Sequence, residues 1–195
     1  MFDRQVQVLL TGGIGAGKSS VGELLRARGA LVIDADSIGH QVLEPGGPAY
    51  YRVAETWPSV VVDGAIDRRR LADIVFRDPA ELRRLEGFTH VAIRRRITEM
   101  IERSTERVVV VEVPLLTDFM GDGWLRVVVD ADLDLRKQRL DRRGTEPDDT
   151  ARRMGNQPTR AEWVAAADVV IDNSGDAEML RGQVEALWGR LTFGS

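Results

Sequence analysis

The chain has 195 residues, of which 43% are hydrophobic, so it is long enough for one well-buried core and short for two independent ones. Its 27 Lys and Arg residues against 31 Asp and Glu give a net charge of −4, which argues against a dedicated nucleic-acid or membrane-surface binder. The absence of cysteine excludes disulfides, thiolate metal sites and cysteine nucleophiles.

The first predicted strand spans residues 6–10 and leads directly into a glycine-rich loop. No basic region, long apolar stretch or cleavage site precedes it, and no segment of the chain approaches the ~20 apolar residues of a membrane span. We therefore expect a soluble, cytoplasmic protein that is a monomer or a weak homo-oligomer.

Residues 12–19 read GGIGAGKS and fit the phosphate-loop pattern G-x-x-x-x-G-K-[ST], between a strand and an amphipathic helix predicted over 20–28. In this pattern backbone N–H groups converge on phosphate oxygens, the lysine reaches the β- and γ-phosphates, and the hydroxyl binds Mg²⁺. Lys18 is thus a candidate catalytic residue and Ser19 a candidate magnesium ligand. We assign nucleotide binding to Gly13, Ile14, Gly15, Ala16, Gly17, Lys18, Ser19 and Ser20.

The phosphate loop alone leaves the reaction open, because kinases, ATPases and GTP-dependent switches all share it. A GTP switch needs an N-K-x-D motif to read the base, and the sequence has none. A kinase and a slow ATPase that acts by changing shape remain.

The second predicted strand, residues 30–33, ends in two carboxylates, Asp34 and Asp36. They fall at the carboxyl end of a strand, where doubly wound sheets bind ligands. Phosphoryl transfer to an alcohol needs a carboxylate to take the hydroxyl proton, and Mg²⁺ needs oxygen ligands. We predict Asp36 as the base, in contact with the acceptor, and Asp34 as a metal or loop-supporting residue. The alternative is that both are ordinary turn formers.

Residues 35–107 form a long, mostly helical excursion before the third strand, with helices predicted over 68–76 and 79–103 from the spacing of apolar residues. This segment can cover an acceptor site. His90 lies within it and can hydrogen-bond an acceptor, although a structural role is the alternative for an isolated histidine.

The third predicted strand, residues 108–113, has the apolar-strand-then-acid form of a Walker B element, and we expect Glu112 to hold magnesium through water. Pro114, Leu115 and Leu116 follow directly. They line an apolar wall for the acceptor or belong to the core.

The fourth predicted strand, residues 125–129, is followed by an arginine-rich helical segment broken by Gly144 and Pro147, which is typical of a mobile lid. Arg139 and Arg143 are four residues apart and share a helix face, with Arg136 one turn earlier. We assign catalysis to Arg139 and nucleotide binding to Arg143, because lid arginines can neutralise phosphate charge in the transition state. A solvated helix with paired charges is the alternative.

The fifth predicted strand spans residues 169–171. Five apolar runs that alternate with helices predict a five-stranded parallel sheet in an α/β/α sandwich, the three-layer P-loop fold. We expect one domain made of three parts: a core of residues 1–36, 105–132 and 165–195, a helical acceptor-binding region over 37–104, and a lid over 133–160.

Several separated motifs together resemble the dephospho-coenzyme A kinase family, and the match runs over nearly the whole chain. The motifs are LTGGIGAGKS at 10–19, VIDAD at 32–36, EPG at 44–46, DGAIDR at 63–68, LA at 71–72 with VF at 75–76, TH at 89–90, VPLL at 113–116, RM at 153–154 with Gln157, and ADVVIDN at 167–173.

This resemblance implies ATP-dependent phosphorylation of the ribose 3′-hydroxyl of dephospho-coenzyme A, with Mg²⁺, in a fold of core, helical acceptor-binding region and lid. The base of the family falls on Asp36 and its lid arginine near Arg139. Two alternatives remain: another small-molecule P-loop kinase, acting on a nucleoside or nucleotide, and a regulatory module that hydrolyses ATP slowly.

Overall fold

The computed structural model describes residues 5–114, 116 and 119–193. It divides into two compact units, one made of residues 1–34 with 104–195 and the other of residues 35–103. Each unit has a hydrophobic core of its own. No helix in the described part of the chain is long and apolar enough to cross a membrane.

The first unit is built on a five-stranded parallel sheet, with strand order β2-β5-β1-β6-β7. Its strands are β1 (Val6–Thr11), β2 (Leu31–Asp34), β5 (Val108–Glu112), β6 (Leu125–Asp130) and β7 (Val169–Asp172). All five predicted apolar runs form strands, so the predicted fold class is confirmed. The reason is burial: β5 has four consecutive valines, and each is completely buried.

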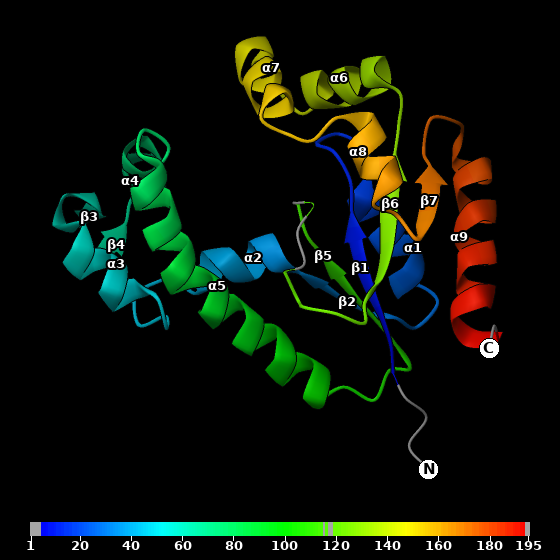
Figure 1. Cartoon of the computed structure of the whole chain (residues 1–195), viewed down its shortest axis with the longest axis horizontal. Coiled ribbons are helices and arrows are strands. Elements are labelled where there is room, and N and C mark those ends of the chain that lie inside the picture. The colour runs from blue at the N-terminus through cyan, green and yellow to red at the C-terminus, as the bar shows by residue number, and fades with distance from the viewer. Residues whose placement is uncertain (1–4, 115, 117–118, 194–195) are drawn as a thin grey trace. The chain divides into compact units, whose positions relative to one another are not determined.

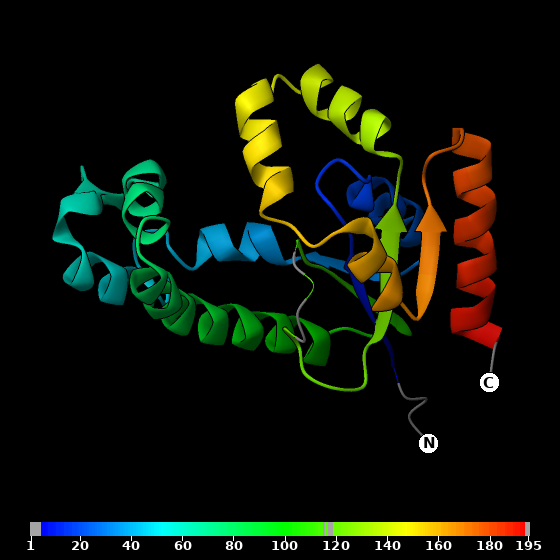
Figure 2. The same cartoon turned by 45° about the horizontal axis from the view of Figure 1, so that its top comes forward.

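Two helices pack together against one face of this sheet, α1 (Lys18–Arg26) and α9 (Ala177–Phe193) (Figures 1 and 2). Their apolar residues, among them Leu25 and Leu187, share one core cluster with alternate strand residues such as Val8 and Leu10. The helix α8 (Arg160–Ala165) packs on β6 and buries Trp163. The layers are therefore those of an α/β/α sandwich.

The strand order places the end of β1 at a topological switch point. From β1 the chain runs to β2 and β5 on one side of it, and then crosses to β6 and β7 on the other. In open parallel sheets ligands bind beyond the carboxyl ends of the strands at such a point. The glycine loop that follows β1 lies there.

Two helices connect β6 to α8, α6 (Leu133–Arg142) and α7 (Pro147–Gly155). They occupy the segment predicted as a lid. This segment ends at a capping box, in which the side chains of Thr159 and Glu162 each accept the other residue's backbone N–H, and α8 begins there. The buried Asp130, at the end of β6, accepts a hydrogen bond from Arg160 Nε at 2.7 Å and forms an ion pair with Arg160 Nη2 at 2.6 Å, which ties this helix start to the sheet.

The second unit, residues 35–103, is mostly helical. Its elements are α2 (Ala35–Gln41), α3 (Tyr50–Thr56), the 3₁₀ turn Pro58–Val60, the hairpin strands β3 (Val61–Val62) and β4 (Ala65–Ile66), α4 (Arg68–Val75) and α5 (Pro79–Glu102). Asp67 and Asp78 cap α4 and α5 through their side chains, and Pro79 occupies the first turn of α5. The core of this unit gathers around Trp57, whose indole N–H donates to Glu81 at 2.6 Å.

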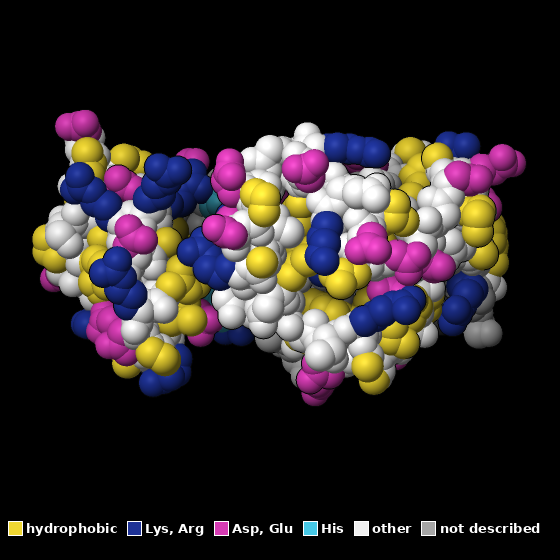
Figure 3. All heavy atoms as spheres, turned by 90° about the horizontal axis from the view of Figure 1, so that it is seen from above, with side chains coloured by type: hydrophobic (Ala, Val, Ile, Leu, Met, Phe, Trp, Pro, Cys, Tyr) yellow, Lys and Arg dark blue, Asp and Glu magenta, His cyan; other side chains and the backbone are white. Residues whose placement is uncertain are grey.

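Charged residues of both signs are exposed in both units. On the face drawn in Figure 3, Lys and Arg side chains are interspersed with Asp and Glu instead of forming one continuous basic area. The arginine runs 68–70 and 94–96 are exposed.

Candidate active site

The glycine loop joins the end of β1 to the start of α1, and its backbone favours glycine at positions that include Gly12 and Gly17. Gly12 has φ +143°, and a Cβ there would lie 2.2 Å from the carbonyl oxygen of Val129. Gly17 has φ +99°, and a Cβ there would lie 2.1 Å from Nδ2 of Asn173. Any side chain would push the loop off the strands behind it.

The loop ends in a helix start that suits an anion. Gly17 occupies the N-cap of the nine-residue α1 and has no side chain to cover its first N–H groups. Lys18 Nζ donates to the carbonyl of Gly12 at 3.0 Å, so this side chain folds back over the loop. The residues predicted to bind the nucleotide, 13–20, therefore run from the loop directly into the first turn of α1. Their contacts with a nucleotide stay a prediction.

The three residues predicted to hold magnesium meet at the carboxyl edge of the sheet. Asp34 and Glu112 are register partners at the ends of β2 and β5. Ser19 Oγ donates to Glu112 Oε1 at 3.3 Å. Over the described residues no group of three or more His, Asp and Glu side chains gathers as a metal site, so a cation here needs further oxygens, such as those of a nucleotide and water.

The residues predicted to meet the acceptor are divided between the two units. Asp36 is exposed in the first turn of α2, two residues beyond the end of β2, and His90 is half-buried in α5. Pro114 and Leu116 follow β5 and are half-buried. Leu115 lies outside the described residues. The roles of all five stay predictions.

Arg139 lies against the outside of the loop. Its guanidinium donates to the carbonyls of Ala16 and Gly15, at 3.2 and 3.4 Å, and to that of Asn173 at 2.8 Å. The prediction that it neutralises phosphate charge therefore requires these backbone contacts to be exchanged for phosphate oxygens.

The sequence pattern assigned no role to Asn173, which is buried, with a relative exposure of 7%. Its Nδ2 donates to the carbonyl of Ala16 at 2.7 Å, and its backbone N–H donates to that of Asp130 at 2.8 Å. It therefore fastens the loop to the ends of β6 and β7. A polar residue directly after an apolar strand is the signal that would have found it.

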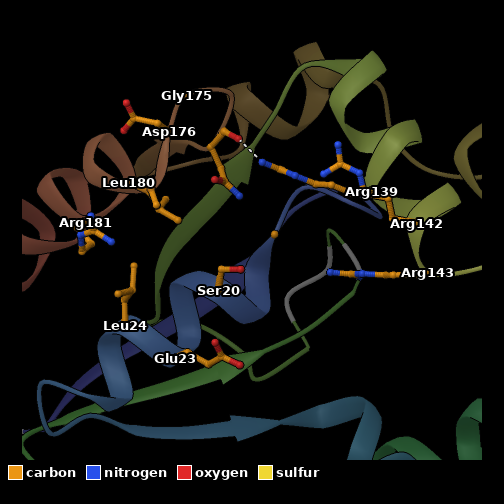
Figure 4. Close-up of a pocket in the computed structure, with 13 residues that line it drawn as sticks. Ser20, Glu23, Leu24, Arg139, Arg142, Arg143, Gly175, Asp176, Leu180 and Arg181 are labelled. Carbon is orange, nitrogen blue, oxygen red and sulfur yellow. Dashed lines mark hydrogen bonds between the residues drawn. The ribbon is translucent and has the colours of Figure 1, made fainter.

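A cavity of ≈ 610 Å³ opens beside the loop (Figure 4). Ser20, Glu23 and Leu24 of α1 form one side of it, α6 supplies arginines, and the connection from β7 into α9 closes it. Arg139 extends from α6 across this space to Asn173, the contact dashed in Figure 4. The other lining residues are Gly17, Arg142, Arg143, Gly175, Asp176, Ala177, Leu180 and Arg181. Of the predicted residues, the cavity thus brings together Gly17, Ser20, Arg139 and Arg143.

Two more side chains hold the middle of the loop. Gln157 Oε1 accepts the backbone N–H of Ile14 at 2.9 Å, and Arg136 Nε donates to the carbonyl of Ile14 at 2.8 Å. Burial lowers the pKa of Arg136, and the nearby Asp130 opposes that shift. Sequence reasoning grouped Arg136 with the phosphate-facing arginines and gave Gln157 no role.

Comparison with known sequences gives one consistent result. The family model described as dephospho-CoA kinase matches residues 6–178. A dephospho-CoA kinase of Frankia casuarinae is 42% identical over 184 residues, which is 92% of this chain and 80% of the relative. That of Leifsonia xyli subsp. xyli is 42% identical over 191 residues, 93% of this chain and 96% of the relative.

Solved structures agree with the fold. The crystal structure of TT1252 from Thermus thermophilus matches with a TM-score of 0.87 and 32% identity, over 97% of this chain and 99% of the other. A shikimate kinase from Acinetobacter baumannii, solved with shikimate, matches with a TM-score of 0.55 and 16% identity, over 96% of this chain and 93% of the other. At that identity the likeness concerns the fold alone.

Proposed function

The chain belongs to the dephospho-CoA kinase family, and from that membership we infer how its residues divide the work of phosphoryl transfer from ATP to dephospho-CoA. The enzyme is an ATP-dependent phosphotransferase. We propose that the 3′-hydroxyl oxygen of the acceptor ribose attacks the γ-phosphorus of ATP. The bond from that phosphorus to the β-bridging oxygen then breaks, and ADP leaves.

We propose that the cavity beside the loop takes the nucleoside part of ATP, and this cavity is the observation that supports the proposal most. It opens directly from Gly17 and Ser20, at the start of α1, where the phosphates would lie. Its volume, ≈ 610 Å³, is within the range of small-molecule sites.

The residues around the phosphates would act mainly by position and charge. Lys18 reaches the β- and γ-phosphates once it leaves the Gly12 carbonyl, and the backbone N–H groups of the loop hold the phosphate oxygens. Asp36 takes the proton of the acceptor hydroxyl. Arg139 and Arg143, beside the cavity, neutralise phosphate charge.

The acids at the sheet edge fit Mg²⁺. Ser19 and Glu112 already share a hydrogen bond, and the register sets Asp34 beside Glu112. We propose Ser19 as a direct ligand and the two acids as groups that hold the metal's water molecules. When bound, Mg²⁺ neutralises charge on the β- and γ-phosphates. The variant Glu112→Gln should then need ~10-fold more Mg²⁺ for half-maximal rate, and an unchanged requirement would remove Glu112 from this role.

The test of the reaction is ADP release from MgATP by the purified protein, with dephospho-CoA, AMP, adenosine or shikimate as the acceptor. We expect stimulation by dephospho-CoA alone, with coenzyme A as the product. The variant Lys18→Ala is the control for a contaminating kinase and should lose the activity by ~10²-fold or more. Stimulation by another acceptor would point to a different small-molecule kinase, and stimulation by none to the regulatory alternative.

A further inference from the structure

Two side chains from outside the phosphate loop bond the backbone of the same loop residue, Ile14. Gln157 accepts the N–H of Ile14, and Arg136 donates to the carbonyl of the same residue. The two side chains also approach each other, with 3.5 Å between an Arg136 terminal nitrogen and Gln157 Oε1. Both backbone polar groups of Ile14 are therefore occupied, in an environment where all three residues are half-buried.

These two side chains come from the two ends of the predicted lid, residues 133–160. Arg136 lies in the first turn of α6, and Gln157 lies two residues beyond the end of α7. Near Gln157, the pairing of Arg160 with the buried Asp130 fixes the returning chain to the sheet. Both ends of the lid thus meet the loop, with the rest of the lid between them.

The loop is shaped to accept Arg136. A Cβ on Gly13 would lie 2.4 Å from an Arg136 guanidinium nitrogen, and a Cβ on Gly15 would lie 2.7 Å from the Arg136 backbone oxygen. The phosphate-loop pattern leaves both positions open to any residue. Close packing of α6 on the loop leaves little room for a side chain at these two places, and at Gly15 the φ of +76° favours glycine as well.

We propose that Arg136 and Gln157 are positioning residues for phosphoryl transfer, which hold the Ile14 backbone and so fix the loop in the shape that receives the nucleotide phosphates. Neither side chain needs to touch ATP. Because both residues belong to the predicted lid, a change in the position of the lid also changes their hydrogen bonds to Ile14. The inference rests on the proposed role of this loop as the ATP site.

The proposal is tested with Arg136→Ala, Gln157→Ala, the double variant, and the conservative Arg136→Lys and Gln157→Glu, by equilibrium binding of MgATP and by steady-state kinetics. Each alanine variant should weaken ATP binding ~10-fold, because a half-buried backbone group loses its partner. Gln157→Glu keeps the acceptor oxygen and should stay within ~3-fold of the wild type. Arg136→Lys keeps one charged donor and should fall between the wild type and Arg136→Ala.

The double variant should lose ~10- to 30-fold instead of the ~100-fold expected for independent residues, because the two side chains hold one backbone segment. In all variants kcat at saturating ATP should change by less than ~3-fold. The control is Lys137→Ala, which removes an exposed positive charge from the same helix and should leave ATP binding unchanged.

A second readout needs no nucleotide and no turnover. Hydrogen exchange at the Ile14 amide should be faster in Gln157→Ala and remain slow in Gln157→Glu. Unchanged protection in Gln157→Ala, or additive losses in the double variant, would overturn the proposal. If Arg136→Ala instead lowered kcat by ~100-fold or more and left ATP binding unchanged, Arg136 would be a group that touches the transferred phosphoryl. Because exchange is measured on the free protein, a wrong assignment of the reaction would not obscure this result.

Discussion

Proton transfer from the acceptor hydroxyl requires a base, and Asp36 is the carboxylate that we propose for it. It is exposed at the start of α2, two residues beyond Asp34 at the end of β2. Asp36→Asn keeps the shape and removes the basic oxygen, so kcat should fall ~10²- to 10⁴-fold while ATP binding stays within ~2-fold. Steady-state kinetics and equilibrium binding measure the two effects.

The matched control for this variant is Asp63→Asn, in the same unit. Asp63 lies in the turn between β3 and β4 at φ 50°, a conformation that asparagine also tolerates. This control should keep the wild-type rate. An Asp36→Asn enzyme with the wild-type kcat would remove Asp36 from the role of base.

Gly12 is a residue whose backbone lies directly against a strand. An alanine at this position would place its methyl group against the Val129 carbonyl, and its backbone would have to adopt φ +143°. Gly12→Ala should therefore lower the free energy of unfolding by ~3 kcal/mol or more. For a chain of this size that is a fall in Tm of roughly 6–12 °C.

Gly182→Ala is the opposite case and serves as the control. Gly182 is exposed inside α9, and a Cβ added there would meet no atom within 4 Å, so alanine should raise the free energy of unfolding by ~0.5–1 kcal/mol. Urea unfolding of both variants measures the difference. A Gly12→Ala protein as stable as the Gly182→Ala protein would show that the backbone at position 12 relaxes without a cost in free energy.

The sequence indicates candidate site residues more directly than it indicates the side chains that hold them in place. GGIGAGKS carries its chemistry in a local pattern, so Lys18 and Ser19 could be assigned from spacing alone. Asn173 and Gln157 lie more than 140 residues further along the chain, and their side chains bond backbone atoms of the loop. Backbone atoms are the same in every residue, so the loop sequence does not indicate these partners. Such contacts appear only when the strand order is known.

At the scale of elements, the connection from β7 into α9 lines the cavity and contains an acid-sensitive contact. The hydrogen bonds of Asp172 with the side chain and backbone of Ser174 hold the pKa of this carboxyl below its ordinary value. A carboxyl with a lowered folded pKa adds stability that is present above its unfolded pKa of ~3.9 and is lost as the pH falls through the folded pKa. The effect should stay below ~1 kcal/mol, because the side chain is largely exposed.

The prediction concerns the difference in unfolding free energy between the wild type and Asp172→Asn. The variant should be less stable at pH 7, and the gap should close below about pH 4, as the wild-type carboxyl becomes protonated. Urea unfolding between pH 7 and pH 3 measures it. A gap that stays constant over this range would mean that Ser174 interacts equally with the acid and the amide.

Elements with a clear hydrophobic pattern were predicted from the sequence, and short elements without one were missed. The five parallel strands are apolar on both faces and were all predicted, whereas β3 and β4 have two residues each and were not. Strands this short carry no periodicity, and only Asp63-Gly64, a hairpin turn sequence, indicates them. The helix α3 was missed as well, because it has seven residues and only Val53 is buried in it.

At the scale of the whole molecule, the residues proposed for ATP belong to the unit made of residues 1–34 and 104–195, and two of those proposed for the acceptor, Asp36 and His90, belong to the unit of residues 35–103. Binding of a ligand slows hydrogen exchange in the segments that it stabilises. We therefore expect MgATP alone to protect the loop, α1 and the β7–α9 connection. Dephospho-CoA should extend protection to α2 and α5.

Exchange measured peptide by peptide, with each ligand alone and with ADP plus dephospho-CoA, separates these contributions. Lys18→Ala should lose the ATP-dependent protection and keep that caused by dephospho-CoA, because the two ligands rely on different residues. The variant His90→Ala should show the reverse, with ATP-dependent protection intact. If ATP alone slowed exchange throughout residues 35–103, that unit would respond to the nucleotide as well, and its assignment to the acceptor alone would be wrong.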